Sequence, residues 1–167
     1  MLELGKAGTA GAGKGTMPVL RDGAPVGTLR ASAWREGATA TVGGTSLVFA
    51  RSGRELTGAV AGADAVRFRA RVTSMWTGTW ALELDGTAVE MRTTSWWRGT
   101  RRYTAAGRTL AETSSTGWLR RPTLTAADDL SLEAQVFVLW VELVILRRAG
   151  EAAAGAGVAA GAAGAAG

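Results

Sequence analysis

Residues 132–148 read LEAQVFVLWVELVILRR, and this stretch decides the fold. At about 100° per residue, its apolar side chains cover the whole circumference of a helix. Gln135 and Glu142 share one side of that helix, but Glu133 lies opposite them, so no continuous polar face exists. A helix that is apolar all round is either enclosed by protein or placed in lipid.

Both ends of this predicted helix carry recognisable signals. Residues 125–128 and Ser131 offer side chains that cap a helix N-terminus. Arg147 and Arg148 lie where cations favour a helix C-terminus, and Gly150 suits the position after the last helical residue. The sequence therefore predicts that the helix ends near residue 148.

A membrane location for this helix is the less favoured of the two environments. A span needs about 20 predominantly apolar residues. Arg147 ends the apolar run early, and Glu142 would lie inside the bilayer at a cost of a few kcal/mol. We therefore expect the helix to be buried in protein. A tail-anchored span, with the arginine pair as its cytoplasmic flank, stays open as the alternative.

The chain before the helix shows the period-two pattern of β-strands. In AVRFRARV, residues 65–72, apolar side chains alternate with three arginines, which indicates a half-buried strand. Residues 79–92, TWALELDGTAVEMR, predict a hairpin with Asp85-Gly86 as its two-residue turn. Similar runs between residues 17 and 124 indicate about nine to eleven strands, which favours a closed barrel or a sandwich.

A single helix surrounded on all sides requires a sheet that wraps it. We therefore predict a mainly β fold, an antiparallel β-barrel or strongly curved sheet that encloses one C-terminal hydrophobic α-helix. The predicted domain covers residues 17–149. Residues 1–16 are expected to be a flexible Gly-rich segment, and residues 150–167 a disordered Ala/Gly tail.

This order of parts resembles the superfamily of tubby C-terminal domains, plant LURP-one-related proteins and phospholipid scramblases. The resemblance covers about residues 18–148 and rests on GTWALELDG (78–86), STGWLRRP (115–122) and VFVLWVELVILRR (136–148). It implies a β-barrel around a C-terminal hydrophobic helix, and tubby-like domains bind phosphoinositides through basic surface residues. The chain is short for the family, which leaves room for a missing strand pair. The cysteine clusters and the acidic calcium loop of scramblases have no counterpart, so lipid scrambling is not expected here.

The composition excludes several kinds of chemistry. The chain has 167 residues, no cysteine and no histidine, which removes disulfides, thiolate chemistry and the commonest general base. No pair of carboxylates and no Ser/Lys couple stands out by spacing. We expect no enzymatic activity, no cofactor and no metal site. No signal peptide is recognisable, so the expected location is the cytoplasm, with a peripheral position at the membrane as an extension of it.

A glycine-rich stretch near the N-terminus has a sequence similar to that of a nucleotide-binding loop. Residues 8–16, GTAGAGKGT, match the glycine, lysine and threonine spacing of adenylate-kinase-like loops. A phosphate-binding loop needs a helix N-terminus directly after it, and Pro18 followed by a strand pattern indicates otherwise. Nucleotide is therefore not an expected partner.

The net charge of +5 and 17 arginines among 19 basic residues permit an acidic partner. SWWRGTRRY, residues 95–103, interleaves aromatic and basic groups as membrane-interface and nucleic-acid surfaces do. The alternative is structural, with aromatic rings in the barrel and arginines lying over them. The candidate anion- or lipid-binding residues are Arg67, Arg69, Arg71, Arg92, Trp96, Trp97, Arg98, Arg101, Arg102 and Arg108.

Two further predictions concern the interior. Trp80, Trp118 and Trp140 are expected to pack between barrel wall and helix, although a tryptophan-lined ligand pocket is an alternative. Glu142 lies on an enclosed helix, so it must find an arginine or hydrogen-bond donors, or be held neutral.

Three functional hypotheses follow from the sequence. The first is a non-enzymatic module that binds an anionic surface, with acidic membrane phospholipid as the first candidate and nucleic acid not expected. The second is a structural or protein-interaction domain without a ligand. The third is a carrier of a small hydrophobic ligand, which requires a cavity between helix and wall. The sequence does not predict the oligomeric state.

Overall fold

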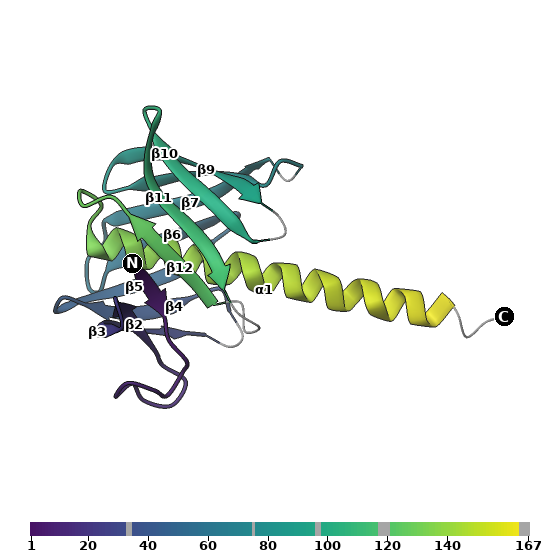
Figure 1. The fold of residues 1–167 in the computed structure, drawn as a ribbon, viewed down its shortest axis with the longest axis horizontal. Helices are drawn as coiled ribbons and strands as arrows, with labels where there is room; N and C mark the ends of the chain where they lie inside the picture. Colours follow the sequence, from purple (N-terminus) through teal and green to yellow (C-terminus); the bar gives the residue numbers. More distant parts are fainter. Residues whose placement is uncertain (33–34, 75, 96–97, 117–120, 164–167) are drawn as a thin grey trace.

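The chain forms a closed antiparallel barrel around one helix (Figure 1). The computed structural model describes residues 1–32, 35–74, 76–95, 98–116 and 121–163. The elements in these ranges are β1 Leu2–Leu4, β2 Met17–Arg21, β3 Ala24–Ala31, β4 Ala38–Val42, β5 Thr45–Ser52, β6 Glu55–Val60, β7 Val66–Ser74, β8 Thr79–Leu84, β9 Thr87–Ser95, β10 Thr100–Ala105, β11 Arg108–Thr116, β12 Arg121–Ala126 and α1 Leu132–Ala163. The predicted fold class, a barrel with a single C-terminal helix, is confirmed.

Each strand pairs with the next in sequence, and β1 closes the barrel between β2 and β12. Leu2 lies opposite Leu124 on one side and Arg21 on the other. No free edge is left among the described strands, so the backbone donors and acceptors of the wall are satisfied within it. The twelve described strands exceed the expected nine to eleven.

The N-terminal segment differs from the sequence-based expectation. Leu2 and Leu4 are buried at 1% and 2% exposure, so residues 2–4 are a part of the barrel wall and not a loosely attached entry. The Gly5 N–H also donates to the Pro18 carbonyl at 2.8 Å. A strand of three residues is too short to produce a periodic signal, which explains why the pattern failed to reveal it.

The loop that resembles a nucleotide-binding motif connects two strands. The Gly8 N–H donates to the Thr16 carbonyl at 2.9 Å, which closes the loop on itself. Strand β2 begins at Met17, so no helix N-terminus follows the glycines. The loop therefore lacks the aligned amides and dipole that bind a phosphate in such motifs.

Several connections are tight turns that need left-handed backbone conformations. Asp85 and Gly86 have φ of 49° and 80°, and Asp22 and Gly23 have φ of 51° and 83°. Consecutive positive φ angles are typical of type I′ hairpin turns, which match the twist of the strands. The predicted hairpin over residues 79–92 is thereby confirmed as β8 and β9.

Because consecutive strands are antiparallel, their connections lie alternately at the two ends of the barrel. The entry end, where α1 enters the barrel, holds the connections β2–β3, β4–β5, β6–β7, β8–β9, β10–β11 and β12–α1. The exit end, where α1 leaves, holds the connections β3–β4, β5–β6, β7–β8, β9–β10 and β11–β12, whereas the β1–β2 loop lies beside the barrel, short of the point where α1 leaves (Figure 1). At the entry end, Ser131 caps the helix by accepting the Ala134 N–H at 3.2 Å and donates to Asp85 at 2.8 Å.

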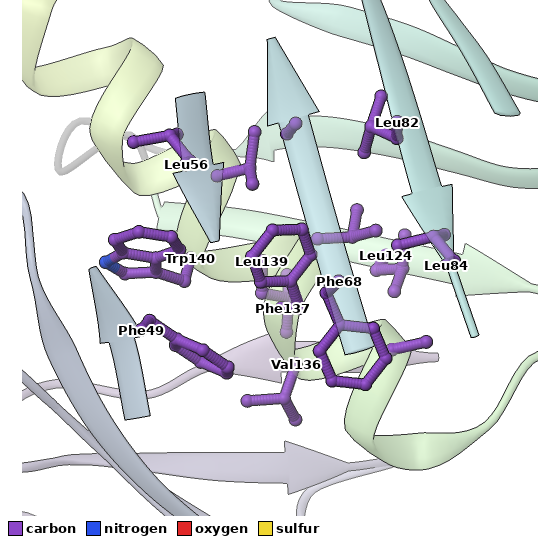
Figure 2. Packing of buried hydrophobic residues seen from close by; sticks show 14 of the residues in the cluster. Phe49, Leu56, Phe68, Leu82, Leu84, Leu124, Val136, Phe137, Leu139 and Trp140 are labelled. Atoms are coloured by element: carbon purple, nitrogen blue, oxygen red, sulfur yellow. The ribbon is translucent and has the colours of Figure 1, made fainter. Parts of the chain in front are cut away.

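The interior is filled by the helix and by the side chains of the wall. Residues 136–141 are each exposed by 1% or less, so the prediction of a helix enclosed on every side is confirmed. Four aromatic rings pack at its centre: Phe137 lies 5.3 Å from Phe68 and 5.5 Å from Phe49, and Trp140 stacks on Phe49 at 5.2 Å (Figure 2). The predicted packing of Trp80 and Trp140 is also confirmed, since both are buried, whereas Trp118 lies outside the described residues.

One glycine allows the helix to approach the wall this closely. Gly58 lies between Phe49 and Phe68 in the sheet register, directly under the ring of Phe137. A Cβ atom at Gly58 would lie 3.0 Å from carbon atoms of all three rings. Because Gly58 has no side chain, the three aromatic rings can occupy the space beside it.

The helix continues well past the residue at which the sequence predicted its end. Gly150 remains helical, with no positive φ, and α1 extends to Ala163. Alanine is the strongest helix former, and its abundance after residue 150 offsets the cost of the interspersed glycines. The continuation projects away from the barrel at the exit end (Figure 1). Within the described part of the chain, no helix has a stretch that is both long and apolar enough to cross a membrane.

Candidate binding surface at the exit end of the barrel

The three predicted arginines of β7 lie on the outside of the wall, and two of them form ion pairs. Arg67 binds Asp85 at 2.7 Å and covers the ring of Phe68, and Arg69 binds Glu55 at 3.0 Å. Arg71 is exposed and has no acidic partner among the described residues. The stripe exists as predicted, but most of its charge is neutralised by acids on the neighbouring strands.

The predicted arginines of β9 and β10 are also paired. Arg92 and Arg102 are Cα partners across the two strands. Arg92 binds Glu90 on its own strand, and Arg102 binds Glu112 on β11 at 2.7 Å. These pairs are largely exposed, and such surface pairs contribute little to stability. Because each of these arginines is paired with a carboxylate, each pair has no net charge.

The remaining candidates of this region lie in three different places. Arg108 binds Asp129 at the entry end, and Arg98 is exposed at the exit end. Arg101 points inward and is only 13% exposed. Trp96 and Trp97 lie outside the described residues. The five arginines at positions 92, 98, 101, 102 and 108 therefore do not converge on one surface.

Arg101 belongs to a buried polar cluster centred on Glu142 of the helix. It forms an ion pair with Glu142, which is 2% exposed. The hydroxyl groups of Tyr103 and Thr113 donate to the same carboxylate at 2.7 and 2.6 Å. Burial, and then the charge of Glu142, raises the pKa of Tyr103 well above its usual value of 10.0. The expected arginine and hydrogen-bond donors for Glu142 are thus both present.

The exit end carries arginines that sequence reasoning left out of the candidate set. Arg35 in the β3–β4 connection and Arg54 in the β5–β6 turn are exposed and, like Arg98, have no acidic partner among the described residues. Arg147 of the helix is exposed too, and donates to the Ser32 carbonyl at 2.8 Å. Here the positive charge is not neutralised as it is on the wall.

An exposed tryptophan lies at the same end. Trp76, in the β7–β8 connection, is 97% exposed, which is rare for the largest apolar side chain. In the sequence, Trp34, Trp96, Trp97 and Trp118 also fall in exit-end connections, at positions outside the described residues. The other two tryptophans of the chain are the buried Trp80 and Trp140.

The charges of the connections are segregated between the two ends. The sequence of the exit-end connections contains Arg35, Arg54, Arg98 and Arg120 and a single acid, Glu36. The sequence of the entry-end connections contains all five aspartates, at positions 22, 64, 85, 128 and 129, and no lysine or arginine. The sequence of the connections is therefore basic where the helix leaves the barrel and acidic where it enters.

A groove of about 600 Å³ opens beside the helix at the exit end. Its floor includes Trp140, Leu143 and Val144, and arginines surround it. Glu36 bridges the groove by accepting two hydrogen bonds from Arg148 at 2.6 and 2.7 Å. These bonds, followed by the charges of Arg148 and Arg51, hold the pKa of Glu36 below its usual value, against the opposing effect of burial.

Two further observations on the described residues concern metal sites and unpaired buried groups. Among them, no group of three or more acidic side chains lies close enough to hold a metal ion. Every buried side-chain nitrogen or oxygen in the described ranges has a hydrogen-bond partner. Comparisons of the chain with protein-family models, with curated proteins and with solved structures find no match.

Proposed function

We propose that the protein is a non-enzymatic module that binds the surface of an anionic phospholipid bilayer with the exit end of its barrel. The observation that supports this function is the presence in the exit-end connections of Arg35, Arg54 and Arg98, exposed arginines without an acidic partner among the described residues, together with the exposed Trp76. The barrel with its enclosed helix is compatible with the tubby-like superfamily, in which basic surface residues bind lipid headgroups. We place the binding surface at the exit end because Arg67, Arg69 and Arg102 of the wall are paired with acids.

The two kinds of side chain suit the two layers of a bilayer surface. Arginine is attracted to anionic headgroups, and tryptophan prefers the boundary between headgroups and acyl chains. Each arginine near such a surface contributes about 1 kcal/mol, so Arg35, Arg54, Arg98 and Arg147 together supply about 4 kcal/mol. This alone corresponds to a dissociation constant of about 1 mM. Binding should therefore be weak, dependent on salt and strengthened by Trp76.

Charge reversal at matched positions tests this proposal. Arg98→Glu changes an exposed, unpaired arginine at the exit end, and Arg21→Glu makes the same change at the entry-end terminus of β2. Sedimentation with vesicles of phosphatidylcholine alone, and of phosphatidylcholine with phosphatidylserine, measures binding of each variant. We expect the original protein to bind only the acidic vesicles, and Arg98→Glu to weaken binding more than Arg21→Glu does. Equal binding to both vesicle types, or equal effects of the two variants, would refute the proposal.

The same experiment separates this function from the two alternatives. A structural domain without a ligand would bind neither vesicle type. A carrier of a small hydrophobic ligand needs an internal cavity, whereas the centre of the barrel is filled by the aromatic cluster of Phe49, Phe68, Phe137 and Trp140. The groove beside the helix is open to the exit end and already bridged by Glu36.

A further inference from the structure

The part of α1 beyond the barrel lies on the side that we assign to the membrane. From this geometry we infer that residues 149–163 enter the leaflet that the exit end contacts, so that the helix anchors the barrel end-on. This inference rests on the proposed function, because it takes the exit end as the surface that meets lipid. Its own basis is the direction, the length and the charge of the projecting helix.

The direction of the helix determines where residues 149–163 lie when the exit end contacts a membrane. Residues 136–141 are enclosed by the wall, which fixes the axis of the helix within the barrel. The same helix continues without interruption through the exit end and projects outward (Figure 1). If the connections around it lie on the bilayer surface, an uninterrupted helix must penetrate that surface.

The length of the projection matches one leaflet. At a rise of about 1.5 Å per residue, residues 149–163 extend about 22 Å beyond Arg148. The headgroup layer of one side is roughly 6 Å thick and half of the hydrocarbon core is about 15 Å, which together give about 21 Å. With Arg148 at the level of the phosphates, the helix at Ala163 would lie close to the bilayer midplane.

The distribution of charge along the projection fits the same depth profile. Arg147, Arg148 and Glu151 are the last charged residues of the chain, and residues 152–167 contain only alanine, glycine and valine. The charged side chains at positions 147, 148 and 151 would therefore lie among the headgroups, and no charged side chain of residues 152–163 would enter the hydrocarbon. Within the helix, each turn before the last satisfies its own backbone hydrogen bonds, which lowers the cost of entering lipid.

Alanine and glycine are only weakly hydrophobic, so residues 149–163 contribute little of the attraction to the membrane. In water, an isolated alanine- and glycine-rich helix of this length is only marginally stable. In lipid, the cost of an unpaired backbone group keeps it helical. Cations and tryptophan at the exit end supply the attraction, and the projecting helix fixes the orientation of the barrel.

The absence of cysteine allows a direct depth measurement. Ala159→Cys places a single label site on the projecting helix, and Ala63→Cys places one at the entry end as a control. Each full-length variant is labelled with a nitrobenzoxadiazole fluorophore and mixed with vesicles of phosphatidylcholine and phosphatidylserine. We expect the fluorescence at position 159 to rise severalfold, to shift to the blue and to be quenched by spin-labelled acyl chains, with no change at position 63.

Sedimentation of the same samples distinguishes failure of this inference from failure of the proposed function. If the protein sediments with acidic vesicles but the label at position 159 remains in water, the insertion is refuted and surface binding stands. If the protein does not sediment with them, both are refuted. A blue shift without vesicles that grows with protein concentration would assign the helix to a second copy of the chain and overturn the inference.

A second variant tests the inference without a label. Val158→Asp introduces a charge into the part of the helix that would lie in hydrocarbon, far from the barrel core, and Val158→Ala is its control. We expect Val158→Asp to weaken vesicle binding by roughly tenfold or more, because a carboxylate in the leaflet is costly. Val158→Ala should leave binding nearly unchanged. Equal binding by the two variants would contradict insertion.

Discussion

The cluster around Glu142 should be the most sensitive polar site in the molecule. Glu142→Leu would remove the carboxylate that pairs with Arg101 and accepts the hydroxyl groups of Tyr103 and Thr113. Breaking a buried ion pair by removing one partner costs about 3–5 kcal/mol, because the other charge stays buried. Arg101 retains 13% exposure and can reach some water, which favours the lower end, while two unpaired hydroxyl groups each add about 1–3 kcal/mol.

Taken from the lower end of these ranges, the expected loss for Glu142→Leu is about 5 kcal/mol, which is comparable to the whole stability of a domain at the low end of the typical range of about 5–15 kcal/mol. Glu142→Gln keeps an acceptor for the two hydroxyl groups and removes only the charge, so it should cost less. The double variant Arg101→Met/Glu142→Leu removes both charges. It should be more stable than the sum of the single variants predicts, by about 2 kcal/mol.

Equilibrium unfolding in urea, followed by tryptophan fluorescence, measures these free energies. Trp140 is stacked in the core, so its emission should report the loss of the barrel interior. A cost below about 1 kcal/mol for Glu142→Leu, or additive effects in the double variant, would show that the cluster is not energetically coupled. That result would refute the reasoning that joins the helix to β10 and β11 through Glu142.

Three further predictions concern pH and packing. Tyr103 is the single tyrosine of the chain, and its pKa is raised in the folded state, so it contributes stability that is present below the unfolded value near 10 and is lost as pH rises through the folded value. An alkaline absorbance titration should show no tyrosinate until the protein unfolds. The pKa of Glu36 is lowered, so Glu36→Gln should cost about 1 kcal/mol at neutral pH. In thermal unfolding that difference should shrink as pH falls below the usual value of 4.5 and be lost as pH falls through the lowered folded pKa, and a constant difference would contradict it. Gly58→Ala should cost about 1–3 kcal/mol in urea unfolding, because its methyl group would press on three aromatic rings; a neutral effect would contradict the packing described for β6.

Much of the fold could be predicted from the sequence because its signals are local. The apolar circumference of residues 132–148 required enclosure, and the Asp85-Gly86 turn fixed a hairpin between two alternating runs. The three-residue β1 has no such signal. The end of the helix was misplaced because Gly150 suits a helix terminus, yet the alanines that follow it allow the helix to continue.

The ion pairs on the surface of the barrel could not be predicted from the composition. Arg67 meets Asp85 and Arg102 meets Glu112 only because the strand register brings them together. Glu142 was identified from its place on an enclosed helix, but its partners on β10 and β11 were not. The basic and aromatic exit end becomes visible once the connections are assigned alternately to two ends. That assignment requires every strand boundary, and the boundaries around residues 95–116 were not fixed by the pattern.

The central claim is that the exit end of the barrel faces the lipid. Energy transfer to an acceptor dye on lipid headgroups tests it most directly, with a donor on Thr77→Cys at the exit end or on Ala63→Cys at the entry end. The account predicts strong transfer from position 77 and weak transfer from position 63 on vesicles that contain phosphatidylserine. Equal transfer from both positions, or stronger transfer from position 63, would contradict it.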